Sequence, residues 1–192
     1  MSELIEVTFD DLILRVGDDS DGRTLEGYLV PWDKPAQVSR PIPGYEVFKR
    51  GALTRSVTES KTPIPLLGLH SEDRPIGRLE RSHDDETGQY GVFRLFDTEA
   101  AREARELVRE GIWRGLSVGG FGVPARTEVR KATDGKNLVV RSEIRLDHVG
   151  LVRTPAFEDA RVMALRSAEA FDAVAVAKAR KRQLQLLRQV GS

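Results

Sequence analysis

Three residues of the chain have the chemistry of a serine acyl-transfer site: His70, Ser117 and His148. His70 ends an apolar run, Ser117 lies in the glycine-rich segment Gly115–Gly120, and His148 lies in the apolar segment Leu146–Val152. Serine is a poor nucleophile at neutral pH, so it needs an imidazole within hydrogen-bond reach to take its proton. That imidazole needs a further partner to fix its tautomer. A nucleophile, a base and an orienting group are therefore all available beside strand-like segments.

The same residues also have purely structural interpretations. A histidine on an apolar strand is commonly a hydrogen-bonded core residue, and the glycines around Ser117 are typical of a bulged strand. Those glycines could instead admit a substrate backbone and leave N–H groups free for an oxyanion hole. His83 lies in a polar turn and is interpreted as solvated. The chain has three histidines, but no His-x-x-x-His or Glu-x-x-His spacing favours a zinc site.

Strand alternation gives a prediction for the orientation of His148. In a regular strand, His148 shares a face with Ile144 and Leu146, which predicts an inward imidazole, while Asp147 points with Val149 to the other face. A shift of the strand by one residue would exchange the two positions. Asp147 is therefore the alternative to His148 as the third group.

Composition excludes several classes of protein. The 192 residues are 40% hydrophobic, enough for the core of one domain of ordinary size. Thirty basic and thirty acidic residues give no net charge, so no overall field attracts nucleic acid or a membrane surface. The absence of cysteine excludes a cysteine protease and disulfides. The acidic N-terminal segment and the lack of any long apolar stretch predict a soluble, unexported protein without a membrane anchor.

The elements that must position these residues are mostly strands. Segments rich in Val, Ile, Leu, Tyr and Phe, bounded by Gly, Pro and Asp, predict strands at residues 12–16, 25–32, 64–70, 76–81, 90–96, 116–123, 138–152 and 162–165. Turn signals lie at Asp18–Gly22, Asp84–Gly88 and Asp134–Gly135, and they favour hairpins. The predicted fold class is mainly β with flanking helices (α+β), with antiparallel pairing.

Two helices and a tail complete the predicted elements. Apolar spacing over residues 99–110 predicts an amphipathic helix capped by Asp97 or Thr98 and ended by Gly111. A shorter helix is predicted over 51–58, and the proline-containing stretch 33–44 is interpreted as an excursion or a loop. After Arg166 the chain loses proline and gains alanine and leucine, which predicts a basic helical tail. The chain therefore divides into a domain over 1–166 and a helical C-terminal tail over 167–192.

An ordered set of short segments resembles the prohead maturation proteases of tailed bacteriophages. The segments are Leu25–Trp32, Glu46–Leu53, Leu66–His70, Pro75–Arg78, Gly115–Gly119 and His148–Val152 followed by Pro155-Ala156. Together they cover the chain from Leu25 to Val162, and the ordered set is more specific than any single motif. The resemblance implies a herpesvirus assemblin-like fold, a closed antiparallel β-barrel flanked by helices.

The resemblance also implies roles for the three residues. Ser117 corresponds to the nucleophile and His70 to the general base of a serine endopeptidase. His148 stands where phage members usually have Glu, whereas the herpesvirus enzymes use a second histidine as the third member. The chain therefore resembles a Ser-His-His triad on a phage protease frame, and Gly150 replaces the usual Ser.

The family context gives the expected substrates and location. The substrates are scaffold protein or the scaffold segment of the major capsid protein, together with the protease itself, inside the immature capsid (prohead) in the host cytoplasm. An extended peptide is expected to dock as an added strand beside Ser117, and homo-oligomerisation is a further expectation. No cofactor, metal, nucleic acid or membrane is expected to take part. The alternatives are a catalytically inactive capsid-interior or scaffold protein of the same fold and a metal-dependent hydrolase.

Overall fold

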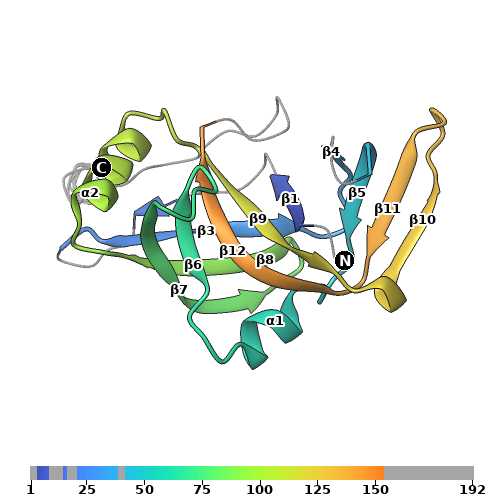
Figure 1. The fold of residues 1–192 in the computed structure, drawn as a ribbon, viewed down its shortest axis with the longest axis horizontal. Coiled ribbons are helices and arrows are strands. Elements are labelled where there is room, and N and C mark those ends of the chain that lie inside the picture. The colour runs from blue at the N-terminus through green and yellow to red at the C-terminus, as the bar shows by residue number, and fades with distance from the viewer. Residues whose placement is uncertain (1–3, 9–14, 17–20, 39–41, 154–192) are drawn as a thin grey trace, which may run out of the picture.

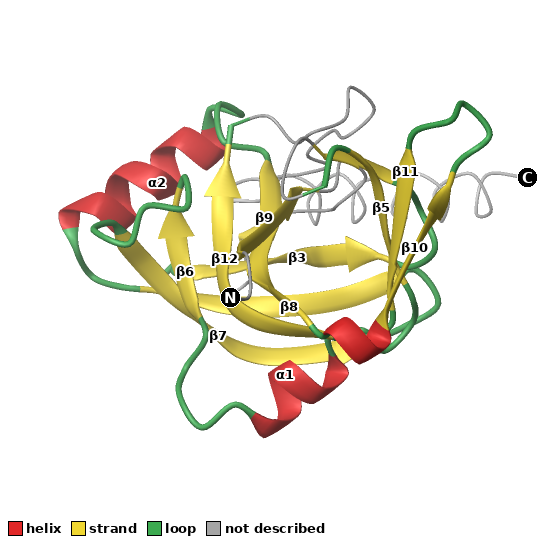
Figure 2. Cartoon of the chain, turned by 45° about the vertical axis from the view of Figure 1, so that its right-hand side comes forward, coloured by secondary structure: helices red, strands yellow, loops and turns green. Residues whose placement is uncertain are grey.

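A curled eight-stranded sheet forms most of the molecule (Figure 1). The computed structural model describes residues 4–8, 15–16, 21–38 and 42–153. Across the sheet the strands follow the order β1 (Leu4–Thr8), β9 (Gly115–Gly122), β12 (Ile144–Val152), β6 (Pro65–Gly68), β7 (Pro75–Asp84), β8 (Gly88–Leu95), β3 (Thr24–Pro31) and β2 (Arg15–Val16). Figure 2 shows the sheet curling around its concave face.

The predicted closed antiparallel barrel is corrected to a curled half-barrel of mixed pairing. Among the described residues, β1 and β2 end the strand order and do not pair with each other. Strand β12 runs parallel to β6, with Gly150 opposite Leu67 and Leu151 opposite Gly68. Parallel neighbours have their carboxyl ends at the same edge, so the turn after β6 lies beside the end of β12. Short-range turn signals reveal hairpins only, which is why the sequence indicated antiparallel pairing alone.

A second, four-stranded sheet extends from the first. Its order is β10 (Thr127–Lys131), β11 (Asn137–Arg141), β5 (Gly44–Phe48) and β4 (Ala36–Val38). The strand predicted over 138–152 is in fact two strands in two sheets, because the chain leaves β11 at Arg141 and enters β12 at Ile144. Strands β4, β5 and β10 had no prediction. Strand β4 is only three residues long, and β10 carries charged residues because four of its five side chains are exposed. Strand β5 buries Glu46 beside Val47 and Phe48, so its sequence shows no regular apolar alternation.

The buried core lies against one face of the large sheet. Fully buried side chains from four of its strands include Leu29, Phe93, Leu116 and Val149. Each such side chain removed from water contributes about 1.5–3 kcal/mol to folding. Helix α2 (Glu99–Arg109) adds Ala104 and neighbouring apolar residues to this core.

Both predicted helices are present. Helix α2 is capped as expected, since the Thr98 hydroxyl accepts a hydrogen bond from the Ala101 N–H at 3.3 Å. It is followed by Gly111 in the left-handed region, at φ +67°. The shorter helix, α1 (Thr54–Glu59), begins three residues later than predicted, and a 3₁₀ turn (Pro124–Arg126) precedes β10.

Several predicted elements lie outside the described residues. These are residues 12–14 of the first strand, the strand over 162–165 and the helical tail over 167–192. The division of the chain at residue 166 therefore stays a prediction. Within the described part, no helix is both long and apolar enough to cross a membrane.

Candidate active site

Ser117 lies on β9, the strand next to β1 at one end of the large sheet. Its side chain is buried, and its strand is bordered by β12 on one side and β1 on the other. Ser117 pairs directly with Gly150 of β12, and the next residue on the same face, Gly119, pairs with His148. Directly opposed residues of antiparallel strands share a face. Ser117, Gly119, His148 and Gly150 therefore form one patch on the sheet.

A β-bulge sets the orientation of His148, and it corrects the predicted face. Leu146 pairs with Gly120 and His148 with the adjacent Gly119, so Asp147 is an extra residue in β12. Before the bulge, Leu146 is on the core face. After it the alternation is reversed, and Val149 is on the core face instead. His148 consequently lies on the Ser117 face rather than with Ile144 and Leu146, although its ring is buried.

His70 reaches the same patch from the turn that follows β6. The Leu69 N–H donates to the Leu151 carbonyl at 3.0 Å, which fixes the turn to the end of β12. Leu69 and His70 both adopt left-handed backbone, with φ of 56° and 58°. Such conformations cost of order 1–3 kcal/mol for residues other than glycine and cluster at functional sites. The turn therefore holds the His70 ring over the sheet at an energetic cost to the fold.

The two imidazoles are in direct contact. His70 Nδ1 lies 2.7 Å from His148 Nε2, and the rings meet edge to face at 73°. The other nitrogen of His70, Nε2, lies 2.6 Å from the point that a Cβ on Gly150 would occupy. Because Gly150 is the direct partner of Ser117, this nitrogen sits over the Ser117–Gly150 pair. The structure thus brings all three predicted site residues together.

The glycines of the patch make room for these rings. A Cβ on Gly119 would stand 2.3 Å from the His148 ring, and one on Gly150 would stand 2.6–2.8 Å from the His70 ring. For the glycines around Ser117, the sequence left two interpretations, a bulged strand and space for a substrate backbone. In the structure, the space at Gly119 holds the His148 ring, and the space at Gly150 holds the His70 ring.

Asp147 completes a chain of four polar groups. Its Oδ2 lies 3.0 Å from His148 Nδ1, and its side chain is 54% exposed whereas that of His148 is 5% exposed. An ionised carboxylate only accepts, so His148 donates through Nδ1 and accepts through Nε2. His70 must then donate through Nδ1, which leaves a lone pair on Nε2. One tautomeric arrangement satisfies the whole chain and directs the basic nitrogen of His70 toward the Ser117–Gly150 pair.

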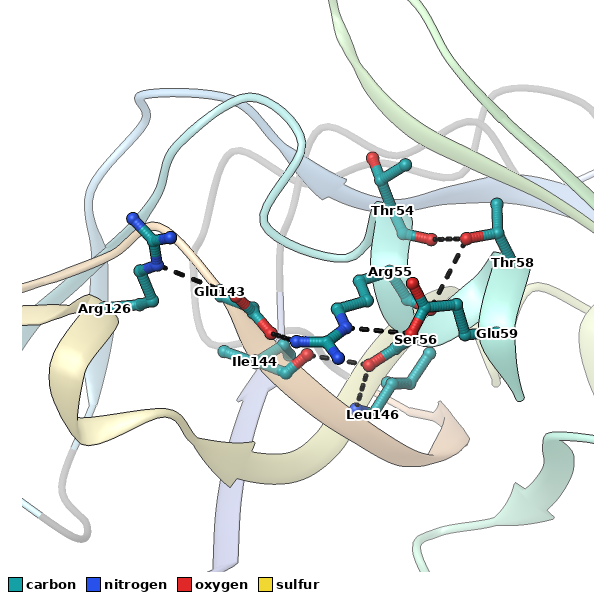
Figure 3. A network of polar contacts seen from close by, with 9 residues as sticks. All are labelled: Thr54, Arg55, Ser56, Thr58, Glu59, Arg126, Glu143, Ile144 and Leu146. Atoms are coloured by element: carbon teal, nitrogen blue, oxygen red, sulfur yellow. Dashed lines mark hydrogen bonds and ion pairs between the residues drawn. The ribbon is translucent and has the colours of Figure 1, made fainter. Parts of the chain in front are cut away.

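Ser56 of α1 supports β12 just before the bulge (Figure 3). Its hydroxyl donates to the Ile144 carbonyl at 2.7 Å and accepts from the Leu146 N–H at 2.9 Å. Strand β6 pairs with β12 only from Val149 onward, so this hydroxyl takes the place of a neighbouring strand there. Ser56 was not predicted to belong to the site, because nothing near it in the chain indicates a contact 88 residues away.

Arg74 supports the turn that carries His70. Its carbonyl accepts from the Gly68 N–H at 2.9 Å, which closes the loop between β6 and β7. Its guanidinium lies 5.2 Å from the centre of the Trp113 ring and forms an ion pair with Glu103 of α2 at 2.5 Å. The loop is therefore fastened to the segment that leads into β9. Arg74 was not predicted from the sequence either.

An open hollow of about 550 Å³ borders the exposed side of the polar chain. It is lined by Asp147, Arg145 and Phe121 together with residues of α1. The Arg145 guanidinium stacks on the Phe121 ring at 5.1 Å. Solvent and ligands can thus reach the Asp147 carboxylate. Among the described residues, no three His, Asp or Glu side chains are placed to hold a metal ion.

Comparison with known proteins gives a family and a fold. The family model of the caudovirus prohead serine proteases matches residues 10–174. The solved structure of the bacteriophage T4 capsid assembly protease, gp21, matches with a TM-score of 0.53 and 15% sequence identity. That match covers 80% of this chain and 98% of the other. No curated protein sequence matches this chain.

Proposed function

This chain belongs to the caudovirus prohead serine protease family, and from that premise we propose that Ser117, His70 and His148 are its catalytic triad. The observation that carries the proposal is the position of His70. One of its nitrogens faces His148 at 2.7 Å, and the other lies over the pair that Ser117 forms with Gly150. A base held between a nucleophile and an orienting group is the arrangement that serine acyl transfer needs.

The proposed reaction follows from the tautomers. Ser117 Oγ attacks the scissile carbonyl carbon while its proton passes to His70 Nε2. His70 then gives the proton to the leaving amine, and a water molecule hydrolyses the acyl-enzyme by the same route in reverse. His148 accepts from His70 Nδ1 throughout, and so keeps the imidazole in the orientation that serves both steps.

Asp147 has a proposed role of its own, as a positioning and charge-stabilising residue behind His148. A neutral imidazole brings no negative charge to stabilise the imidazolium that forms on His70. The Asp147 carboxylate, which is hydrogen-bonded to His148 Nδ1, supplies that charge from the side of His148 that is remote from His70. The bulge thereby makes the two alternatives from the sequence compatible, since His148 contacts the base and Asp147 contacts His148.

The proposed substrates are those of capsid maturation. As a prohead protease, this enzyme acts in capsid assembly, and we infer that it cleaves scaffold protein or the scaffold segment of the major capsid protein, and itself, inside the prohead. The competing hypothesis is an inactive scaffold protein with a triad of the same geometry. The two hypotheses differ in whether the protein cleaves peptide bonds.

The deciding experiment is co-expression with the neighbouring capsid and scaffold genes, with the products followed by mass spectrometry. We expect wild type to process them and Ser117→Ala to process none, because the variant loses the nucleophile and little core volume. Wild type should react covalently with a fluorophosphonate at Ser117, and His70→Ala should lose both activities. Cleavage by Ser117→Ala at the wild-type rate would refute the assignment.

A further inference from the structure

The edge of β9 beside Ser117 is already occupied by the chain's own first strand. Strand β1 pairs with β9 along its whole length, from Leu4 opposite Phe121 to Thr8 opposite Ser117 (Figure 1). The other edge of β9 is taken by β12. A substrate that docks as an added strand on β9 must therefore occupy the place of β1.

The direction of β1 matches the acyl half of a substrate. It runs antiparallel to β9, so its C-terminal end is the end that meets Ser117. In acyl transfer the residues on the N-terminal side of the scissile bond carry the attacked carbonyl, and they must approach the nucleophile with their C-terminal end. A strand that ran in the opposite direction would instead place along this edge the residues on the C-terminal side of the scissile bond, which carry the leaving amine.

Within the described part of the chain, the remaining edges of the sheet near the site offer no equivalent place. Beyond β12, the stretch opposite Val149 to Leu151 is paired with β6, and the stretch before the bulge is bonded to Ser56. Extended peptides gain affinity from main-chain hydrogen bonds to an exposed strand edge. Near Ser117, the β9 edge becomes such an edge when β1 leaves it.

We propose that the β9 edge from Ser117 to Phe121 is the acyl-side substrate edge and that β1 is its intramolecular occupant, which substrates displace. The inference rests on the proposed function, because it takes Ser117 as the nucleophile. Its consequence is regulatory: the fraction of molecules with β1 detached sets the apparent affinity for substrate. If β1 is detached in a tenth of the molecules, its removal lowers KM about tenfold without lowering kcat.

The kinetic test compares the full chain with a variant that lacks residues 2–8, on one extended peptide. We expect KM to fall about tenfold and kcat to persist. A synthetic peptide of residues 2–8 should restore inhibition of the truncated protein, competitively with substrate. An unchanged KM, with cleavage intact, would overturn the inference and leave the proposed function standing.

A matched pair of proline variants tests the same point in the full chain. In an antiparallel ladder, successive residues turn their N–H groups to opposite sides. Of Ile5→Pro and Glu6→Pro, only one removes a hydrogen bond to β9. That variant should lower KM as truncation does, and its neighbour should behave as wild type. Equal KM values for the two variants would contradict the proposal.

A binding test separates this inference from the proposed chemistry. Truncated protein carrying Ser117→Ala is titrated with a fluorescent peptide of residues 2–8, and polarisation is measured. We expect saturable binding. N-methylation of alternate residues should abolish binding when the methylated N–H groups are those that face β9, and should spare it when they are the intervening ones. Binding without any catalysis in wild type would refute the enzyme and retain the strand site, whereas absence of binding would refute the strand site itself.

Discussion

At the scale of single residues, the proposed triad has the Asp147 carboxylate behind it. Asp147 contacts His148, and His148 contacts His70, so a change at Asp147 is expected to act on the proposed base through the His148 ring. Its side chain is 54% exposed, and solvent screens its charge. Its effect on the rate is therefore expected to be moderate.

We expect Asp147→Asn to lower kcat about tenfold, equivalent to about 1.4 kcal/mol in the barrier. The substitution removes the negative charge that stabilises the imidazolium formed on His70 in the transition state, so kcat should fall while KM is unchanged. The measurements are kcat and KM on one peptide for wild type, Asp147→Asn and His148→Ala. A raised KM with an unchanged kcat would leave Asp147 only a structural role.

A substitution at Gly150 tests how the His70 ring is packed. Gly150→Ala places a methyl group 2.6 Å from His70 Nε2, so the imidazole must leave its position over Ser117. We expect kcat/KM to fall by at least tenfold and the unfolding free energy to fall by about 1–3 kcal/mol. In a His70→Ala background the clash is absent, and the same substitution should cost little stability. Additive losses in the double variant would show that the backbone, rather than the ring, resists the methyl group.

At the scale of elements, β12 has to combine a bulge with a buried position in the sheet. Ser56 of α1 satisfies the backbone immediately before the bulge, and the parallel pairing with β6 begins immediately after it. The site is therefore held from both sides by elements distant in the chain. Loss of the Ser56 hydrogen bonds or of the pairing with β6 should therefore displace His148.

We expect Ser56→Ala to lower the unfolding free energy by about 1–3 kcal/mol, because the Ile144 carbonyl and the Leu146 N–H lose their shared partner. kcat should fall with it, since the bulge is no longer fixed. Thr58→Ala is the matched control on the same helix. Its hydroxyl bonds only within α1, at 2.8 Å to the Thr54 carbonyl. Denaturant unfolding and peptide cleavage would be measured for both, and equal losses would argue against the role of Ser56.

At the scale of the whole molecule, one turn connects three strands of the large sheet. Asp85, between β7 and β8, accepts hydrogen bonds from the Tyr28 hydroxyl at 2.7 Å and from the Thr87 and Gly88 N–H groups at 2.7 and 3.0 Å. Partial burial raises the pKa of the Asp85 carboxyl. The hydrogen bonds from Tyr28, Gly88 and Thr87 outweigh that effect and lower the pKa below its ordinary value of 3.8.

A lowered pKa in the folded state makes Asp85 a source of stability that acid removes. The contribution is complete above pH 3.8 and is lost as the pH falls through the lower value of the folded protein. We expect wild type to be more stable than Asp85→Asn from pH 5 to 7 and the difference to vanish on further acidification. Urea unfolding of both proteins between about pH 2 and 7 measures it. A difference that is constant over the whole range would refute the assigned cause.

The residues of the site were accessible from the sequence because their chemistry is local. A serine among glycines indicates a nucleophile, and two histidines beside apolar runs indicate bases, whatever the fold. The ordered motifs around these residues indicated the family. Local signals also sufficed for α2 with its Thr98 cap and for the hairpins at Asp84–Gly88 and Asp134–Gly135. Each of these features depends on interactions between residues close in the chain.

Only the tertiary structure decided how those residues meet. The parallel pairing of β6 with β12, the bulge at Asp147 and the pairing of β1 with Ser117 join segments that are tens of residues apart. A bulge changes the count on one strand by a single residue, and it reverses which side chains face the core. No local pattern encodes that change, because it is set by the register with a partner strand. The sequence thus determined which groups are present, and the long-range pairing of strands determined which of them touch.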